Sequence, residues 1–331
     1  MCDTNWVSVL VTGAAGFIGS HTAVRLLQRG DQVIGLDNLN DYYSPERKRS
    51  NLREVAREAR SAAQFELIEG DIRDRALLER LFRQYDIRAV INLAAMAGVR
   101  VSVQDPWLYY DVNLTGTLNL LEAVRAQSTR ATFVLASTSS VYGGTAALPF
   151  VETDSADRPL APYAASKRAA ELLGFTYHHL HGLDFTALRF FTVYGPRGRP
   201  DMMAYKVLDS AYGGEPVPYF NAGQMHRDWT FVDDIVSGIV AAADRRLGYE
   251  VINLGRGEPV LVADFVSTLE HLARRKPHLV EQPMSDADVK YTYADIGKAR
   301  RLLAYDPQVN VAEGTQRFFD WYVAHAKPSG Q

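Results

Sequence analysis

The sequence holds a single cysteine, Cys2, close to its first residue. No internal disulfide can form, and a metal site built on cysteine ligands is excluded. Neither sign of charge dominates, because 36 Lys and Arg stand against 39 Asp and Glu. This balance gives no global positive field that would gather nucleic acid or an anionic membrane. A reducing compartment fits these features, and a local basic site for a diphosphate stays open.

Long apolar runs are also missing, since no stretch approaches the length that a membrane-spanning helix needs. Residues 1–6 run directly into an apolar, strand-like stretch, without the basic segment and apolar core of a secretory signal. We therefore expect a cytoplasmic protein. Its 331 residues, 47% of them hydrophobic, suit one large domain or two fused ones.

Short runs rich in β-branched residues alternate with longer segments of helical period. The expected strands are residues 7–11, 32–36, 65–69, 89–93, 132–136, 185–188 and 251–254. The helical segments between them include residues 17–29, 75–84, 109–127 and 163–181. Strands separated by helices of this length predict an α/β fold of the doubly wound Rossmann type, with a parallel sheet covered on both faces.

The rhythm changes after Arg189, where proline and glycine concentrate and irregular loops separate the helices. We therefore predict two regions. Residues 1–194 form a dinucleotide-binding Rossmann domain, whose sheet is completed by residues 250–254. Residues 195–331 form a smaller, mostly helical substrate lobe.

A glycine-rich turn follows the first expected strand and opens the first expected helix. Gly13, Gly16 and Gly19 permit a tight turn and a close approach of the backbone to a pyrophosphate at a helix N-terminus. The second strand ends in Asp37 and Asn38. An acidic residue at this point accepts hydrogen bonds from an adenosine ribose and repels a 2′-phosphate. The pattern predicts NAD rather than NADP.

A catalytic trio is predicted from the fifth strand and the long helix that follows it. Tyr163 and Lys167 lie four residues apart and share a helix face, and Thr138 follows the fifth strand. A phenol is a useless base at its ordinary pKa of about 10. A nearby ammonium, together with a positive nicotinamide ring, is expected to lower the pKa of Tyr163. The phenolate would then take the proton of a substrate hydroxyl that Thr138 orients.

These motifs together resemble the extended short-chain dehydrogenase/reductases. Longer segments resemble the UDP-glucuronate 4-epimerases almost end to end, and they are residues 37–43, 97–100, 189–196, 198–202, 227–230 and 293–296. The resemblance implies NAD-dependent epimerisation at C4 through a 4-keto sugar. The candidate cofactor-binding residues are Gly13, Gly16, Phe17, Ile18, Gly19, Asp37, Asn38, Asn40, Asp71, Ile72, Leu93, Ala94, Ala95, Asn113, Tyr163, Lys167, Phe190 and Val193.

Ser139 and Ser140 bear on which reaction follows the shared first step. The related 4,6-dehydratases carry an Asp-Glu pair just after the threonine, and the related UDP-glucuronate decarboxylases typically show a glutamate nearby. The absence of an acidic side chain at these two positions argues against elimination and favours conversion of UDP-glucuronate to UDP-galacturonate. The alternatives are a 4-epimerase of neutral UDP-sugars (UDP-glucose and UDP-galactose), a UDP-glucuronate decarboxylase, and an NAD-sensing regulatory protein without activity.

A uronic acid raises a specific difficulty, because its 4-keto intermediate is a β-keto acid that loses carbon dioxide when the breaking bond aligns with the ketone. Holding the carboxylate in another orientation suppresses this loss. We expect Ser139, Ser140 and Thr192 to donate hydrogen bonds to the carboxylate. By resemblance, Arg227 binds the diphosphate in a fork geometry. The candidate substrate-binding residues are Arg100, Ser139, Ser140, Thr192, Arg199, Val217, Tyr219, Arg227 and Asp288.

No metal site is expected. His178, His179 and His181 diverge around a helix and have no obvious acidic partner. By resemblance, the helices at residues 109–127 and 163–181 pair with a second subunit as a four-helix bundle, which implies a homodimer. Beyond the UDP-sugar, neither nucleic acid nor a membrane is an expected partner.

Overall fold

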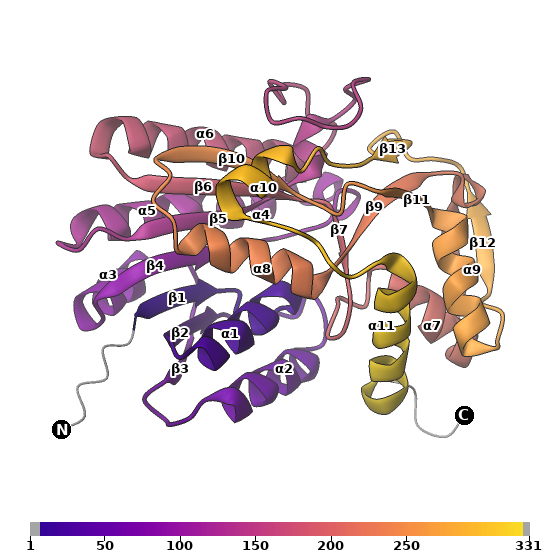
Figure 1. The fold of residues 1–331 in the computed structure, drawn as a ribbon, viewed down its shortest axis with the longest axis horizontal. Helices are drawn as coiled ribbons and strands as arrows, with labels where there is room; N and C mark the ends of the chain where they lie inside the picture. The colour runs from indigo at the N-terminus through magenta and orange to yellow at the C-terminus, as the bar shows by residue number, and fades with distance from the viewer. Residues whose placement is uncertain (1–6, 327–331) are drawn as a thin grey trace.

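Residues 7–326 are described by the computed structural model, in which a seven-stranded parallel sheet runs through the molecule (Figure 1). Its strands are β1 (Ser8–Thr12), β2 (Gln32–Asp37), β3 (Phe65–Glu69), β4 (Ile87–Asn92), β5 (Thr132–Thr138), β6 (Asp184–Phe190) and β10 (Tyr249–Leu254). Their order across the sheet is β3-β2-β1-β4-β5-β6-β10. The predicted doubly wound fold is confirmed, and β10 joins the sheet beside β6 as expected.

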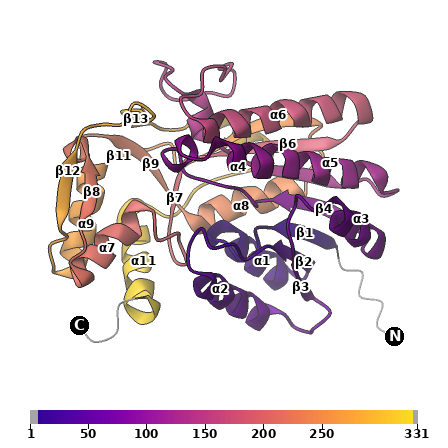
Figure 2. The same ribbon diagram turned by 180° about the vertical axis from the view of Figure 1, so that it is seen from behind.

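Helices cover both faces of this sheet, as Figures 1 and 2 show. One face carries α1 (Phe17–Arg29), α2 (Pro45–Glu58) and α8 (Val232–Ala243), and the other carries α3 (Arg75–Gln84), α5 (Gly116–Ala126) and α6 (Pro162–His181). Val9 and Val11 of β1 pack into the first core, and Leu10 packs into the second. Because both sides of the strand are buried, its sequence is continuously apolar.

Local signals explain where α1 begins and ends. Its apolar residues Ala23, Leu26 and Leu27 recur at helical spacing and are fully buried. Gly30 ends the helix in the left-handed conformation, with φ of 105°, and its N–H donates to the carbonyls of Leu26 and Leu27. This is the usual role of a glycine after a helix.

The single helix expected at residues 109–127 is interrupted. The structure has α4 (Pro106–Tyr110), a π turn (Asp111–Thr115) and then α5. Within the π turn, Asn113 accepts a hydrogen bond from the N–H of Met96 at 2.9 Å and donates to its carbonyl at 3.0 Å. The irregular turn thus fixes the chain that leaves β4, a tertiary contact that helical periodicity does not reveal.

The part after residue 195 contains helices and two small sheets. The remaining helices are α7 (Met203–Gly213), α9 (Val262–Ala273), α10 (Gly297–Leu303) and α11 (Val311–His325). The small sheets consist of β7 (Thr192–Tyr194), β9 (His226–Phe231), β11 (Pro259–Leu261) and β13 (Tyr291–Thr292), and of β8 (Val217–Phe220) with β12 (Leu279–Gln282). Three-residue or four-residue 3₁₀ turns are Val101–Val103, Ser139–Tyr142 and Asn221–Gly223.

The chain returns from this second part to the main sheet more than once. Besides β10, helix α8 packs against α1 and the strands β4, β5 and β6, and α10 contacts β10. The division into regions at residue 194 stays a prediction. Within residues 7–326, no helix has the length and apolar character needed to cross a membrane.

The strand order reverses between the neighbouring strands β1 and β4. From β1 the chain adds β2 and β3 toward one edge of the sheet, and from β4 it adds β5 and β6 toward the other. In open parallel sheets, ligands bind at the carboxyl ends of the strands at such a point. The fold therefore places a site where β1 ends at Thr12 and β4 ends at Asn92.

Candidate active site

The glycine turn after β1 packs so closely that side chains are excluded from it. Gly13 has φ of 68°, and a Cβ there would lie 2.8 Å from the backbone nitrogen of Ala94. A Cβ on Gly19 would lie 2.0 Å from the carbonyl oxygen of Gly13. No side chain caps the N-terminus of α1, and its first turn holds no acidic residue. The first N–H groups of α1 are thus suited to an anion.

Asp37 ends β2 beside this turn, and backbone groups fix its carboxylate. The N–H of Ala15 donates to Oδ2 at 3.0 Å, and the N–H of Leu39 donates to Oδ1 at 2.9 Å. Burial raises the pKa of Asp37, while these two donors and the charge of Lys48 act in the opposite direction. Lys48, a residue that the sequence analysis missed, also donates to Asn40 through its backbone oxygen at 2.7 Å and its Oδ1 at 2.6 Å.

Asp71 follows β3 and is held in an ion pair with Arg73. Arg73 donates from Nη2 to Oδ2 at 2.8 Å, and Asn38 donates to the same oxygen at 2.8 Å. Partial burial raises the pKa of Asp71, but these hydrogen bonds outweigh it and bring the pKa to about 2. The carboxylate is therefore ionised at neutral pH.

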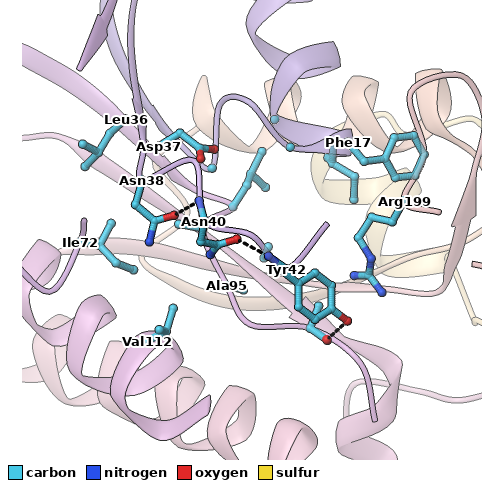
Figure 3. Close-up of a pocket in the computed structure, with 18 of the residues that line it drawn as sticks. Phe17, Leu36, Asp37, Asn38, Asn40, Tyr42, Ile72, Ala95, Val112 and Arg199 are labelled. Atoms are coloured by element: carbon cyan, nitrogen blue, oxygen red, sulfur yellow. Dashed lines mark hydrogen bonds between the residues drawn. The ribbon is translucent and has the colours of Figure 1, made fainter. Parts of the chain in front are cut away.

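These strand ends enclose one pocket, the cofactor pocket, of about 1140 Å³ with the solvent at its mouth included. Figure 3 shows Asp37 and Asn38 in one part of it, with Arg199 at the far end. The predicted residues that line it are Gly13, Gly16, Phe17, Ile18, Gly19, Asp37, Asn38, Asn40, Asp71, Ile72, Leu93, Ala94, Ala95, Tyr163, Lys167 and Phe190. The structure thus brings together most of the predicted cofactor set.

Two predicted cofactor residues lie outside this lining. The buried amide of Asn113 is engaged by Met96 and by Ser166, whose Oγ accepts from Nδ2 at 3.0 Å. Val193 lines a separate small void with Phe17 and Trp229. Both residues support the walls of the pocket, and neither faces it.

The predicted trio gathers beside the pocket. The side chains of Tyr163 and Thr138 share a hydrogen bond, and Tyr163 and Lys167 line the pocket wall. Thr138 Oγ1 also accepts from the N–H of Ser140 at 3.1 Å. This bond orients the threonine hydroxyl at the carboxyl end of β5.

Burial governs the electrostatics of Tyr163 and Lys167 in the structure. It raises the pKa of Tyr163 above its ordinary value, although the charge of Arg199 and the hydrogen bond with Thr138 lower it. Burial also lowers the pKa of Lys167 to about 7, opposed by the charge of Glu171. The combined effect of the Lys167 ammonium and the nicotinamide ring on the pKa of Tyr163 stays a prediction, and Arg199 is a further cation that acts on the phenol.

A second hollow, the polar pocket, opens at the N-terminal end of α6, where Ala161 and Ala164 line it. It is lined by the predicted substrate residues Ser139, Ser140, Thr192, Arg227 and Asp288. Arg100 joins them through an ion pair, since its Nη2 lies 2.5 Å from Oδ2 of Asp288. Burial lowers the pKa of Arg227, and the charge of Asp288 raises it. A half-buried guanidinium of this kind suits a phosphate.

Three predicted substrate residues lie elsewhere. Arg199 lines the cofactor pocket and is paired with Asp201 through two contacts of 2.9 Å. Val217 is buried in β8, and Tyr219 packs against Gly223. Neither Val217 nor Tyr219 lines either pocket, and their predicted role in substrate binding stays a prediction.

The sequence analysis assigned no role to several lining residues. Tyr42 donates to the carbonyl of Ala97 at 2.8 Å and lies across the pocket mouth near Arg199 (Figure 3). Ser137, next to Thr138, and Val112 of the π turn complete the wall. The strand-end position of Ser137 is a signal that the prediction left unused.

The histidines of α6 do not gather around a common point. His178 lies 2.9 Å from the carbonyl of Leu183 through Nδ1, and the ring of His179 stacks on Phe175. Across the described residues 7–326, no group of three His, Cys, Asp or Glu side chains is placed to hold a metal ion.

Comparisons with known proteins agree with this geometry. A family model described as GDP-mannose 4,6 dehydratase matches residues 10–318. A UDP-glucuronate 4-epimerase of Thermodesulfobacterium geofontis (strain OPF15) is 45% identical over 94% of this chain and 95% of its own length. UDP-glucuronate 4-epimerase 2 of Arabidopsis thaliana is 41% identical over 99% of this chain and 78% of its own length.

The chain belongs to the UDP-glucuronate 4-epimerase family of the extended short-chain dehydrogenase/reductases. Its fold agrees with that of the UDP-glucuronic acid 4-epimerase from Bacillus cereus, solved with UDP-glucuronic acid and NAD. The TM-score is 0.87 and the identity 34%, over 96% of this chain and 99% of the other. The predicted family and fold class are confirmed.

Proposed function

We propose that the protein epimerises UDP-glucuronate at C4 to UDP-galacturonate, with NAD as cofactor. The observation that carries this proposal is that the N-terminal end of α6 lines both pockets. Tyr163 and Lys167 line the cofactor pocket, while Ala161 and Ala164 at the start of the same helix line the polar pocket. A sugar held in the polar pocket would therefore meet the phenol and a dinucleotide at once.

The cofactor pocket fits a dinucleotide that carries a free 2′-hydroxyl. The turn at Gly13 leaves room for backbone only, which suits a pyrophosphate at the start of α1. The buried carboxylate of Asp37 accepts ribose hydroxyls and repels a 2′-phosphate. Held by these residues, NAD would supply the hydride acceptor for oxidation at C4 of the sugar, and its reduced form the hydride donor for reduction from the opposite face.

The side chains of the trio move the proton in this scheme. Tyr163 takes the proton of the C4 hydroxyl, and Thr138 holds that oxygen by a hydrogen bond. The charge of the Arg199 guanidinium lowers the pKa of Tyr163, and a protonated Lys167 in the wall of the same pocket would also favour the phenolate. Once the keto sugar has rotated in the polar pocket and presents its opposite face, the same phenol returns the proton to the oxygen at C4.

The polar pocket suits an acidic sugar that must keep its carboxylate. Ser139, Ser140 and Thr192 offer three hydroxyl donors in one place, and the Asp288 carboxylate in the same pocket is paired with Arg100. Hydrogen bonds from these groups would hold the sugar carboxylate away from the alignment that decarboxylation needs. The absence of a general acid or base at positions 139 and 140 opposes elimination.

Product analysis tests the proposal. Purified protein is incubated separately with UDP-glucuronate and with UDP-glucose, and the products are identified by NMR. We expect UDP-galacturonate from the first substrate and little or no reaction with the second. Reaction of UDP-glucose alone would make the protein an epimerase of neutral UDP-sugars, and a UDP-pentose product would make it a decarboxylase.

We also propose that two copies pair through the helical segments at residues 109–127 (the end of α4, the π turn and α5) and 163–181 (in α6), and that the dimer works in the cytoplasm. Trp107 on α4 is 84% exposed, and Leu172, Phe175 and Leu180 on α6 are each at least half exposed. Large apolar side chains grouped on adjacent helices are typical of a protein interface. Light scattering tests the pairing, because Leu172→Glu with Phe175→Glu should yield a monomer if the interface is correct.

A further inference from the structure

The face of α6 that carries Tyr163 and Lys167 continues to Glu171, one helical turn further along. Glu171 is 0% exposed and Lys167 is 2% exposed. Burying a carboxylate is strongly unfavourable unless hydrogen bonds and opposite charge compensate. Neither the comparisons nor the proposed scheme gives this buried acid a role.

Donors from three elements hold the Glu171 carboxylate. Ser137 of β5 donates from Oγ to Oε1 at 2.5 Å. Arg189 of β6 donates from Nε to Oε1 at 3.0 Å and from Nη2 to Oε2 at 2.8 Å. Arg168 of α6 donates to Oε2 at 3.0 Å. The carboxylate therefore ties α6 to both strands, and Ser137 directly precedes Thr138.

The charge of Glu171 is also needed around Lys167. Arg189 and Lys167 are both buried cations, so the region would be strongly positive without the carboxylate. Lys167 and Glu171 form no direct ion pair in the described structure, and the carboxylate acts on the ammonium through its charge. Burial lowers the pKa of Lys167, and Glu171 is the group that opposes this shift.

We propose that Glu171 is a positioning residue for the catalytic pair: its buried charge keeps the proton on Lys167, and its hydrogen bonds hold α6 against the end of β5. The titrations of Tyr163 and Lys167 are coupled. When the pair holds one titratable proton, the active form has a phenolate at Tyr163 and an ammonium at Lys167. Glu171 lies one turn from Lys167 and two turns from Tyr163. Its negative charge therefore favours the ammonium more than it disfavours the phenolate.

The other titratable or charged groups around this face act alongside Glu171. They are Tyr109 of α4, Tyr142 after β5, Arg189 of β6, Tyr249 of β10, Arg168 of α6 and Arg199 after β7. The three arginines are cations and the three tyrosines are neutral near pH 7. Asp201 is an anion paired with Arg199, and Glu171 is the anion whose charge acts on Lys167.

The test variant is Glu171→Gln, which keeps the side-chain volume and an acceptor oxygen for Ser137 and Arg189. Lysines carrying ¹³C at Cε are titrated by NMR in the NAD-loaded protein, and Lys167 is assigned with Lys167→Met. We expect the pKa of Lys167 to fall by about one to three pH units in Glu171→Gln. Glu79→Gln, a charge removal on the outer surface of α3, should leave it unchanged. An unaltered Lys167 titration in a folded Glu171→Gln protein overturns the proposal.

The pH dependence of turnover gives a second readout. In Glu171→Gln, the basic limb of the pH profile of kcat should move to lower pH. The maximal kcat should fall at least tenfold, while KM for UDP-glucuronate should stay nearly unchanged. Glu171→Asp keeps the charge and should retain the limb of the wild type even if kcat falls. A merely structural role predicts the reverse, in which the two variants lose activity alike without moving the limb.

Arg168→Gln covers the case in which Glu171→Gln fails to fold. The Arg168 side chain is 22% exposed, and its removal frees the carboxylate of a competing cation. The Lys167 titration should then move to higher pH, opposite to the first variant, and a downward shift or none contradicts the proposal.

This inference rests on the proposed function only in its kinetic part. The NMR titration does not depend on any sugar, so a wild type that leaves UDP-glucuronate unchanged defeats the function and not the assignment of Glu171.

Discussion

The cofactor pocket and the polar pocket are assembled in different ways. The cofactor pocket takes its groups from the ends of β1, β2, β3 and β4, which the parallel sheet places at one edge in a regular order. The polar pocket joins Ser139 at the end of β5 to Thr192, Arg227 and Asp288, which come from separate segments of the second part of the chain. Backbone geometry dominates the first pocket, and side-chain charge dominates the second.

Because the two pockets differ in this way, we predict that single substitutions will affect the chemical step, sugar binding and cofactor binding independently. The largest expected effect is that of Tyr163→Phe, which removes the proton acceptor shared by the two pockets. We expect kcat to fall by about 10²–10⁴-fold while bound NAD stays constant. Turnover and NAD content are measured on the same sample, with Tyr85→Phe at the outer surface as the control. Unchanged turnover would support an NAD-sensing protein instead.

Arg227→Gln tests the dependence of the polar pocket on charge. Loss of a charged hydrogen bond of about 1.5–3 kcal/mol should raise KM for UDP-glucuronate by about 10–150-fold. Affinity for NAD should stay within twofold, as should both constants in Arg301→Gln on the exposed side of α10. An equal loss of NAD affinity would contradict the separation of the two pockets.

Gly13→Ala tests the dependence of the cofactor pocket on backbone geometry. The added Cβ meets the backbone nitrogen of Ala94 at 2.8 Å in a left-handed conformation. Strain of about 1–3 kcal/mol should weaken NAD binding by about 5–150-fold, as measured by calorimetry. Gly213→Ala is the matched control, because a Cβ there meets nothing within 4 Å.

His21 of α1 contacts the chain that follows β7, and its titration extends the comparison of the two regions to protein stability. Its Nε2 lies 2.9 Å from the carbonyl of Pro196, and burial, reinforced by Arg197, lowers the pKa of His21 from 6.5 to about 3. The unfolded chain binds this proton below pH 6.5 and the folded chain does not, so stability is full above that pH and falls with pH toward 3. Denaturant unfolding at pH 8 and pH 5 should show His21 contributing about 2 kcal/mol to the difference. In His21→Gln, the difference in unfolding free energy between pH 8 and pH 5 should lack this contribution. An identical pH dependence of stability in the variant would refute the role of His21.

The regular arrangement explains why much of the cofactor pocket was predictable. Gly13 and Asp37 follow apolar strands at fixed positions, and the parallel sheet turns that order in sequence into proximity in space. The glycine after α1 and the β-branched strands are equally local signals. The prediction of NAD rested on the glycine turn and Asp37, and the prediction of the family rested on the resemblance of longer segments; both are confirmed by the comparisons.

Groups on helices and distant loops escaped prediction for a physical reason. Lys48 on the charged helix α2 and Glu171 on α6 resemble solvated side chains in sequence, yet both are buried by packing against other elements. The π turn at residues 111–115 follows from a contact between Asn113 and Met96. Burial likewise raises the pKa of Tyr163, and local sequence does not reveal this effect because burial depends on the whole fold.

The most direct test of the account is to follow the hydrogen at C4. UDP-glucuronate carrying deuterium at C4 is incubated with the protein in ordinary water, and the product is analysed by NMR. We predict UDP-galacturonate that retains deuterium at C4, because the same hydrogen leaves one face and returns to the other. Deuterium lost to solvent, or a product inverted at another carbon, would contradict oxidation at C4 as the central step.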